Sequence, residues 1–327
     1  MSKLIVTESL ATGLKNRFFT EMAEVYPKVQ SNFKLKNKHR KNRQGFLKTT
    51  IEVKNAFSES ILLFYEGGSK NRPYITFDLL TVLEGREYNT WNEKCLTGIN
   101  FLVNYEPRLV DDAYGAYNIS EHAISRLFLR TEPKFKGSVI DCRYIRDEMR
   151  SLPFWANYWT LTLYSNEGFN FQGSCFPVIP AISGLFMCEY SKYSKFIEIR
   201  TFVDDAHLNF EQLEVKKLLI EVSNDVLESP LSFFLLVMSS HLERLDLLHG
   251  IISNRILNHK NYWLLKNVFF HRVEDDKFRI SFKNKFDSLL RKYLPLVNFD
   301  VLDVELKKLG VKKFQLEVKK AVLSKSQ

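Results

Sequence analysis

The stretch KFIEIRTFVDDAHLNFEQLEV, residues 195–215, marks the point where a strand-rich part of the chain gives way to a helix-rich part. Its first half, Phe196–Val203, is dense in β-branched and aromatic residues, which predicts a strand. In its second half, Asn209 stands three residues before Gln212, the spacing of a capping box at a helix start. We expect that helix to run to about Glu228, so the fold combines a sheet with helices.

Upstream of this stretch the sequence predicts mainly strands. Besides Phe196–Val203, four runs are rich in Ile, Val, Thr and aromatic residues, with turn signals such as Glu66-Gly67-Gly68-Ser69 between them. These runs are Phe46–Val53, Tyr74–Val82, Ile99–Tyr105 and Trp159–Tyr164. In Phe176–Tyr190 the prolines restrict the first part to a sheet edge or a strand entry, and a strand is expected to follow. Two helices are also predicted, one over residues 5–25 with Thr7 as its N-cap and one from Ser120 to Pro133.

Downstream, helical patterns dominate. Ser229-Pro230 predicts the start of a second long helix, whereas Val268–Val273 and Phe278–Lys283 predict a β-hairpin. We expect an α+β fold with a β-rich, mostly antiparallel N-terminal two-thirds and a mainly helical C-terminal region. The expected domains are 1–45 (a helix and a basic arm), 46–203 (mixed, β-rich) and 204–327 (mainly helical, with the hairpin and a basic C-terminus). Helices packed as a layer on one sheet would fit the pattern after 204 equally well.

Composition indicates a globular protein of a reducing compartment. Of 327 residues, 45% are hydrophobic and 26% charged, which excludes a fibrous or wholly disordered chain. The N-terminus lacks the apolar core of a signal peptide, and the longest apolar run, Pro230–Met238, is far shorter than the roughly 20 residues that cross a bilayer. The four cysteines form no C-x-x-C pair, which argues against a zinc ribbon. We expect a cytoplasmic protein with no membrane partner, no cofactor and no metal.

The net charge of +9 is concentrated in two regions. Between Glu24 and Glu52 there are eight basic residues and no acidic one, and residues 306–327 carry +6. Since residues 1–24 balance at zero, residues 52–305 carry −5. Two basic segments on an otherwise acidic chain predict a polyanionic partner. Lysine and arginine side chains that neutralise phosphates release bound counterions from the polyanion, and this release favours binding.

We therefore expect regions 28–48 and 306–325 to bind nucleic acid, with DNA and RNA both open. A solvated loop or a sorting signal is the alternative interpretation of residues 28–48. The expected contact residues are Lys34, Lys36, Lys38, Arg40, Lys41, Arg43, Lys48, Lys312, Lys313, Lys319 and Lys320.

The C-terminal lysines lie in a pattern that resembles a helix-turn-helix motif. Residues 301–309 and 312–323 suit two helices, with Gly310 between them. The resemblance implies that the second helix presents lysines to a major groove. The alternative is an amphipathic terminal helix that packs through Phe314, Val318 and Val322.

A further candidate site is the helix predicted over residues 121–132. His122, Arg126 and Arg130 stand at i, i+4 and i+8, so they share one stripe. A neutral imidazole with two guanidinium groups suits a metal-independent ribonuclease, in which the histidine moves a proton and the arginines hold the phosphate. The string His122-Ala123-x-x-Arg126-x-x-x-Arg130 resembles a segment of RelE-type toxin relatives, which implies a toxin-like enzyme. The alternative is an exposed basic helix face.

Two other hypotheses use different residues. A metal-dependent nuclease would use Glu198-x-Arg200 with Asp204, Asp205 and His207 as further ligands, although acids at a turn and a helix start explain that cluster too. A protein-interaction subunit of a larger complex would use the 27 Phe, 14 Tyr and 4 Trp at an interface. Aromatic residues in such numbers also suit a core.

Overall fold

The computed structural model describes most of the chain. The described residues are 6–29, 43–57, 60–69, 72–83, 89, 91–104, 114–136, 138–164, 176–191, 196–228, 242–269, 276, 277, 280, 281, 284, 286 and 288. Within these ranges no helix is long and apolar enough to cross a lipid bilayer.

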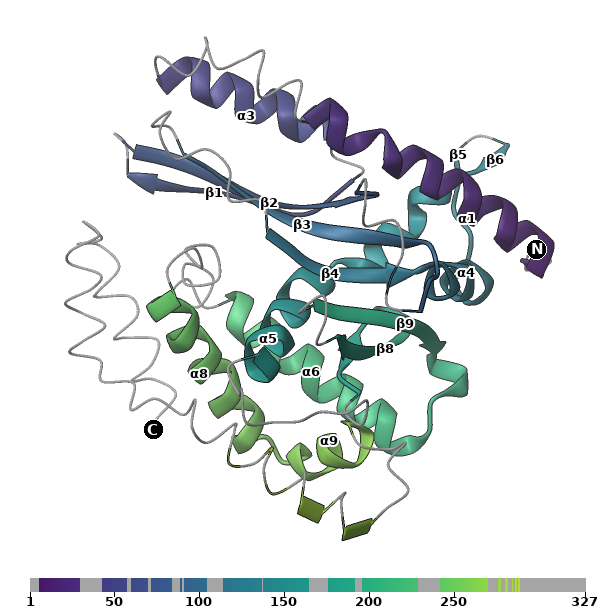
Figure 1. Cartoon of the computed structure of the whole chain (residues 1–327), viewed down its shortest axis with the longest axis vertical. Helices are drawn as coiled ribbons and strands as arrows, with labels where there is room; N and C mark the ends of the chain where they lie inside the picture. The colour runs from purple at the N-terminus through teal and green to yellow at the C-terminus, as the bar shows by residue number, and fades with distance from the viewer. Residues whose placement is uncertain are drawn as a thin grey trace. The chain divides into compact units, whose positions relative to one another are not determined.

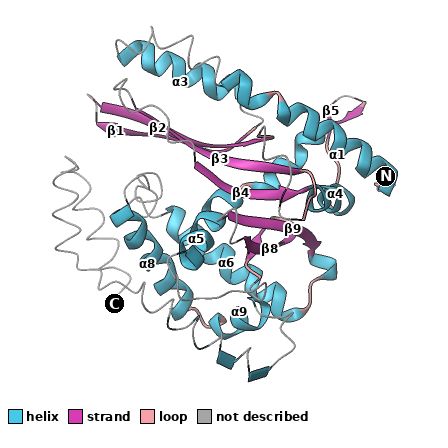
Figure 2. Ribbon diagram, in the orientation of Figure 1, coloured by secondary structure: helices cyan, strands magenta, loops and turns pink. Residues whose placement is uncertain are grey.

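The described strands form one large sheet and one small hairpin (Figure 2). The strands of the large sheet are β1 (Ile61–Ser69), β2 (Arg72–Thr81), β3 (Cys95–Asn104), β4 (Tyr114–Ser120), β7 (Val178–Pro180), β8 (Gly184–Ser191) and β9 (Phe196–Asp204). Their order is β1-β2-β3-β4-β9-β8-β7, and all pairs are antiparallel except β4 with β9. Parallel neighbours need a crossover connection, so the chain between β4 and β9 has to leave the sheet and return. The small hairpin pairs β5 (Phe135–Lys136) with β6 (Val139–Ile140).

The described residues also form helices. They are α1 (Glu8–Ala23), α3 (Arg43–Phe57), α4 (Glu121–Arg130), α5 (Leu152–Tyr164), α6 (Phe210–Glu228), α8 (Leu242–Asn258) and α9 (Tyr262–Phe269), with 3₁₀ helices η2 (Cys142–Met149) and η3 (Asp205–His207). Figure 1 shows α1 and α3 along one side of the sheet and α5 on the other. Strands and helices are therefore both present, as the α+β prediction requires.

The chain divides into two compact units, residues 1–216 with 267–272 and residues 217–266 with 273–327. The first unit holds the whole large sheet. The described elements of the second unit are helical. Within it, Arg255 pairs with Asp225, and His259 Nε2 lies 2.9 Å from Glu221 Oε2, so α8 and the residue that follows it are tied to α6.

The predicted helix starts are confirmed by their capping bonds. The Thr7 hydroxyl accepts a hydrogen bond from the Leu10 N–H at 3.3 Å, which starts α1. At α6, the Gln212 N–H donates to Asn209 Oδ1 at 2.8 Å and the Asn209 N–H donates to Gln212 Oε1 at 3.0 Å. Such caps depend only on residues three apart, so local sequence is enough to predict them.

Two predicted strands are wrong, because they are helices in the structure. Phe46–Val53 lies within α3, and Trp159–Tyr164 forms the second half of α5. A short apolar run fits a buried strand and a buried helix equally well. In α5, Trp155 and Trp159 lie one turn apart and both are fully buried. Nearly all positions of this helix are covered by the rest of the protein, which explains why its sequence lacks a polar face.

The predicted hairpin over residues 268–283 is also wrong. Val268 and Phe269 end helix α9, and Ile280 and Ser281, inside the second expected strand, are helical. The first two residues of the first expected strand continue a helical pattern, since buried residues recur at helical spacing across α9. These buried residues are Leu264, Leu265, Val268 and Phe269.

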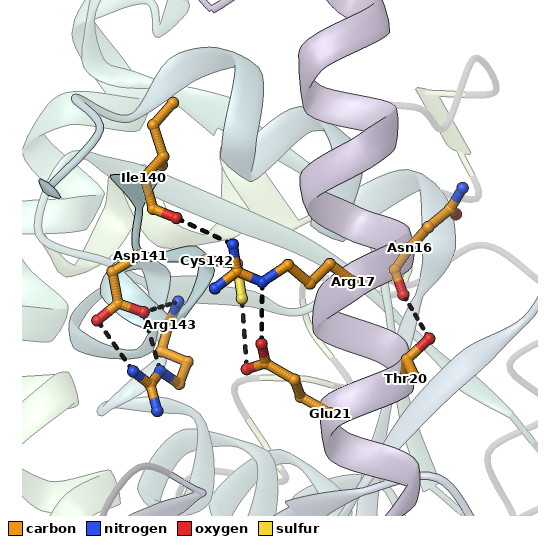
Figure 3. Close-up of polar contacts among 8 residues, drawn as sticks. All are labelled: Asn16, Arg17, Thr20, Glu21, Ile140, Asp141, Cys142 and Arg143. Carbon is orange, nitrogen blue, oxygen red and sulfur yellow. Dashed lines mark hydrogen bonds and ion pairs between the residues drawn. The ribbon is translucent and has the colours of Figure 1, made fainter. Parts of the chain in front are cut away.

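A polar cluster ties α1 to the start of η2 (Figure 3). Arg17 donates from Nε to Glu21 Oε1 at 3.0 Å and from a terminal nitrogen to the Ile140 carbonyl at 3.3 Å. Glu21 Oε2 accepts from the Cys142 thiol at 3.4 Å. Burial, and then the charge of Glu21, raise the pKa of the Cys142 thiol to about 12, so this cysteine is a structural thiol and not a nucleophile.

A buried carboxyl group lies inside the large sheet. Asp78 on β2 is fully buried, and its Oδ1 accepts a hydrogen bond from the Tyr117 hydroxyl on β4 at 2.7 Å. The Tyr117 ring reaches Asp78 by crossing β3 at Gly98, where any Cβ would overlap the ring. Burial raises the pKa of Asp78 to about 7, and the Tyr117 hydrogen bond opposes that rise.

This carboxyl group predicts a pH-dependent stability. Because the Asp78 pKa is raised from 3.8 to about 7, the folded protein keeps a proton that the unfolded chain has lost between those pH values. The free energy of unfolding should therefore fall as pH rises from 5 to 8, on the order of 2 kcal/mol. Asp78→Asn keeps an acceptor for Tyr117 and removes the titration, so its urea midpoint should lack this fall.

The matched control is Glu24→Gln, which alters an exposed carboxylate on α1 and should leave the fall in place. Equal pH profiles for the wild type and Asp78→Asn would show that Asp78 is not the group responsible.

Candidate functional site

Three segments of the first unit meet at the start of helix α4. The Ser120 hydroxyl caps this helix by accepting from the Ala123 N–H at 3.0 Å, and it donates to the Arg200 carbonyl on β9 at 2.9 Å. The next N–H along the chain, from Glu121, donates to the Lys94 carbonyl at 2.7 Å. The helix start, the middle of β9 and the loop before β3 are therefore held together by direct hydrogen bonds.

Helix α4 places the predicted stripe beside its buried face. The four residues that face the core have no exposed surface, and they are Ala123, Ile124, Leu127 and Phe128. His122 is exposed, whereas Arg126 and Arg130 are partly exposed. The sequence prediction that these three side chains lie on one accessible stripe agrees with this burial pattern.

The two arginines of the stripe have different surroundings. Arg130 donates to the Phe202 carbonyl at 2.9 Å and pairs with Asp204 Oδ1 at 3.3 Å. Arg126 makes no hydrogen bond or ion pair with any other residue that the structure describes. The sequence predicted that the two guanidinium groups hold one phosphate together. In the structure, the guanidinium group of Arg130 instead binds the end of β9.

A third arginine, Arg200, lies near the stripe together with a tryptophan. Its Cζ atom lies 3.7 Å from the centroid of the Trp91 ring, in a cation–π contact. Trp91 is 54% exposed. The sequence analysis proposed Arg200 as part of a metal-dependent nuclease site, and it did not identify Trp91 as a site residue. A tryptophan between the polar residues Asn89 and Asn92 was the signal that could have found it, because such a segment is typical of an exposed turn.

The charges around His122 keep its imidazole neutral near neutral pH. Partial burial of the ring and then the positive charge of Arg126 lower the pKa of His122. Arg200 and Arg130 act in the same direction, while Glu93 opposes them. The imidazole therefore offers a proton acceptor beside the Arg126 guanidinium group, which pairs with none of the described residues.

This arrangement suits an anionic ligand. Arg126 offers several hydrogen-bond donors in a planar fork, which fits phosphate oxygens. Asp204 compensates much of the charge of Arg130, and Glu93 lies near His122, so the site is not uniformly positive. Its free positive charge centres on Arg126.

The acids proposed for a metal-dependent nuclease serve as ion-pair partners. Asp204 contacts Arg130 and, at 2.8 Å, His207 Nδ1, whereas Asp205 accepts from Lys216 Nζ at 2.7 Å. Glu198 is buried, with 1% of its surface exposed. Across the described ranges, no group of three His, Cys, Asp or Glu side chains is arranged to hold a metal ion.

Most of the predicted basic contacts lie outside the described residues. Lys34, Lys36, Lys38, Arg40 and Lys41 do so, as does the whole of 306–327 with its helix-turn-helix pattern. Lys28, the first residue of the basic region 28–48, pairs with Glu24 on the preceding turn, so its charge is locally balanced. Arg43 and Lys48 were expected in or beside an irregular arm, but both lie in helix α3, where Lys48 is exposed.

No protein family profile, no curated protein and no solved structure matches the chain. The resemblance of the nine-residue α4 segment to RelE-type toxin relatives therefore stays a prediction.

The different surroundings of the two arginines predict different effects on stability. Arg130→Gln should lower the free energy of unfolding by about 1–3 kcal/mol, because it leaves Phe202 O without its guanidinium donor and leaves Asp204 with His207 but without its guanidinium partner. Arg126→Gln should change stability by no more than about 0.5 kcal/mol, as expected for a surface side chain without a described partner. Urea unfolding of both variants measures the difference, and equal destabilisation would contradict the assigned roles.

Proposed function

We propose that the protein binds nucleic acid. The observation that carries this proposal is the convergence of Arg126, His122 and Arg200 with an exposed tryptophan at the start of α4. Guanidinium groups hold phosphate oxygens, and an accessible aromatic ring is the usual companion of such groups in proteins that bind DNA or RNA.

The basic regions 28–48 and 306–325 are proposed to add to this binding. Their charge of one sign neutralises phosphates without a fixed spacing, because each neutralised phosphate releases counterions. The α4 site adds a fixed contact to this diffuse attraction. We propose both DNA and RNA as possible ligands, and a cytoplasmic setting in keeping with the buried free thiols of Cys95, Cys142 and Cys188.

The salt dependence of binding tests the proposal. Affinity for a fluorescent oligonucleotide should fall steeply as salt rises from 50 to 200 mM on a double-logarithmic plot, with a slope set by the number of phosphates neutralised. Neutralising Lys36, Lys38, Arg40, Lys41 and Arg43 together should reduce the slope by several units, and Arg126→Gln should reduce it by about one.

The matched control is Lys134→Gln. Its ammonium group already pairs with Asp147 at 3.0 Å, so neutralising it should leave the slope unchanged. A wild-type protein that binds neither DNA nor RNA at low salt would overturn the proposal. If the variant with five neutralised residues shows the same salt dependence of affinity as the wild type, region 28–48 does not contribute to binding.

A second candidate function, a metal-independent ribonuclease, is favoured by the surroundings of His122. A neutral imidazole can take the proton of an RNA 2′-hydroxyl as that oxygen attacks the adjacent phosphorus and the bond to the next nucleotide breaks. The imidazolium ion then gives this proton to the departing 5′-oxygen, so the products are a 2′,3′-cyclic phosphate and a free 5′-hydroxyl, and no water or metal enters this step. Arg126 would hold the phosphate oxygens as their negative charge grows.

Incubation of the protein with RNA in EDTA tests this second function. Cleavage should occur, should leave 2′,3′-cyclic phosphate ends, and should fall by at least about a hundredfold in His122→Ala. His207→Ala alters an exposed histidine that pairs with Asp204, and it serves as the control that should retain cleavage. Intact RNA after incubation with the wild type would dismiss the ribonuclease and leave the binding proposal standing.

A further inference from the structure

We propose that Trp91 is a stacking platform for an unpaired base, so that the nucleic acid bound at α4 is single-stranded. The inference rests on the proposed nucleic-acid binding and names its substrate class. Trp91 would contact the bases of the nucleic acid, whereas the arginines near α4 would contact its phosphates.

The Trp91 indole is exposed while it contacts a cation. Arg200 lies over the ring, with its Cζ 3.7 Å from the centroid. Trp91 is nevertheless 54% exposed, so about half of its surface stays accessible with Arg200 in place. A cation behind an aromatic ring leaves the other face free for a planar group, and every nucleobase has a π-face to offer.

The loop that carries Trp91 is held in a fixed conformation. Asn89 is buried, and its Oδ1 accepts from the Trp91 N–H at 3.0 Å and from the Glu93 N–H at 3.1 Å. The Asn89 backbone adds two further hydrogen bonds. Its N–H donates to the Glu93 carbonyl at 3.0 Å, and its carbonyl accepts from the Asn92 N–H at 3.0 Å. Asn92 has φ 58°, a left-handed conformation that asparagine tolerates better than most residues. A fixed loop spends little conformational entropy when a base binds to it.

The platform adjoins the cations of α4. The loop runs into Lys94, whose carbonyl accepts from the Glu121 N–H at 2.7 Å, and then into β3, where Cys95 pairs with Ser120. Arg200 contacts the indole directly and is close enough to His122 to lower its pKa. The base platform and the phosphate-binding groups thus belong to one surface, which is the combination that single-stranded nucleic acid requires.

Base stacking on a protein side chain selects against a duplex. In double-stranded DNA or RNA both faces of each internal base are already stacked on neighbours, and a protruding indole gains access only if a base leaves the helix. A single strand exposes its bases at much lower cost.

The other tryptophans supply the controls. Trp155 and Trp159 are fully buried, so their replacement would disturb the core. Trp263 is 58% exposed and belongs to the other compact unit. Trp263→Leu therefore removes an exposed indole of similar accessibility from the unit that does not contain α4.

The experiment compares Trp91→Leu, Trp91→Phe and Trp263→Leu with the wild type. Fluorescence anisotropy at fixed salt would measure binding to a single-stranded oligonucleotide, to a blunt duplex of the same length, and to heparin, a polyanion without bases. Trp91→Leu should weaken single-strand binding about tenfold or more and leave duplex and heparin binding unchanged. Trp91→Phe should retain most of the affinity, which also shows that the loop remains intact, and Trp263→Leu should match the wild type.

Unchanged single-strand affinity in Trp91→Leu, with the salt dependence of the wild type preserved, would overturn the platform and leave nucleic-acid binding in place. Equal losses for single strand, duplex and heparin would overturn it too, because they would show a change in charge or folding. A wild type that binds heparin but no oligonucleotide would overturn the proposed function together with the platform.

Discussion

The hydroxyl of Ser120 connects the parts on which the rest of the site depends. As an acceptor it caps α4, and as a donor it binds the Arg200 carbonyl on β9. The cap is local, whereas the bond to Arg200 depends on the parallel pairing of β4 with β9, whose register places Ile119 beside Ile199. The crossover between these two strands contains α4 itself. The pairing that joins β1–β4 to β7–β9 therefore also brings Arg200 to the start of α4.

Inside the sheet, a second constraint crosses three strands. The Tyr117 ring spans Gly98 to reach Asp78, so one glycine, one aromatic ring and one carboxyl group depend on each other. Burial raises the pKa of this carboxyl group to about 7, so the group is mainly neutral below that pH. The contact joins β2 to β4 across β3 within the register that the three strands share.

At the surface, similar side chains are used for different purposes. Arg130 secures the end of β9, whereas Arg126 has no such role among the described residues. Trp155 and Trp159 fill the core, and Trp91 lies on an arginine at the surface. A phosphate group and a flat base together would use both properties of this surface, its cationic donors and its accessible ring. Neither the arginine content nor the aromatic content of the chain distinguishes these roles.

The sequence by itself determined the features that depend on neighbours along the chain. The caps at Thr7, Ser120 and Asn209 and the helical stripe of His122 need only spacings of three or four residues, and each is present in the structure. Tertiary structure alone decided whether apolar runs became strands or buried helices, since burial on all sides removes the periodicity that separates them. It also decided which arginine was paired and which tryptophan was exposed, because those contacts join α4 to residues more than 70 positions away on β9.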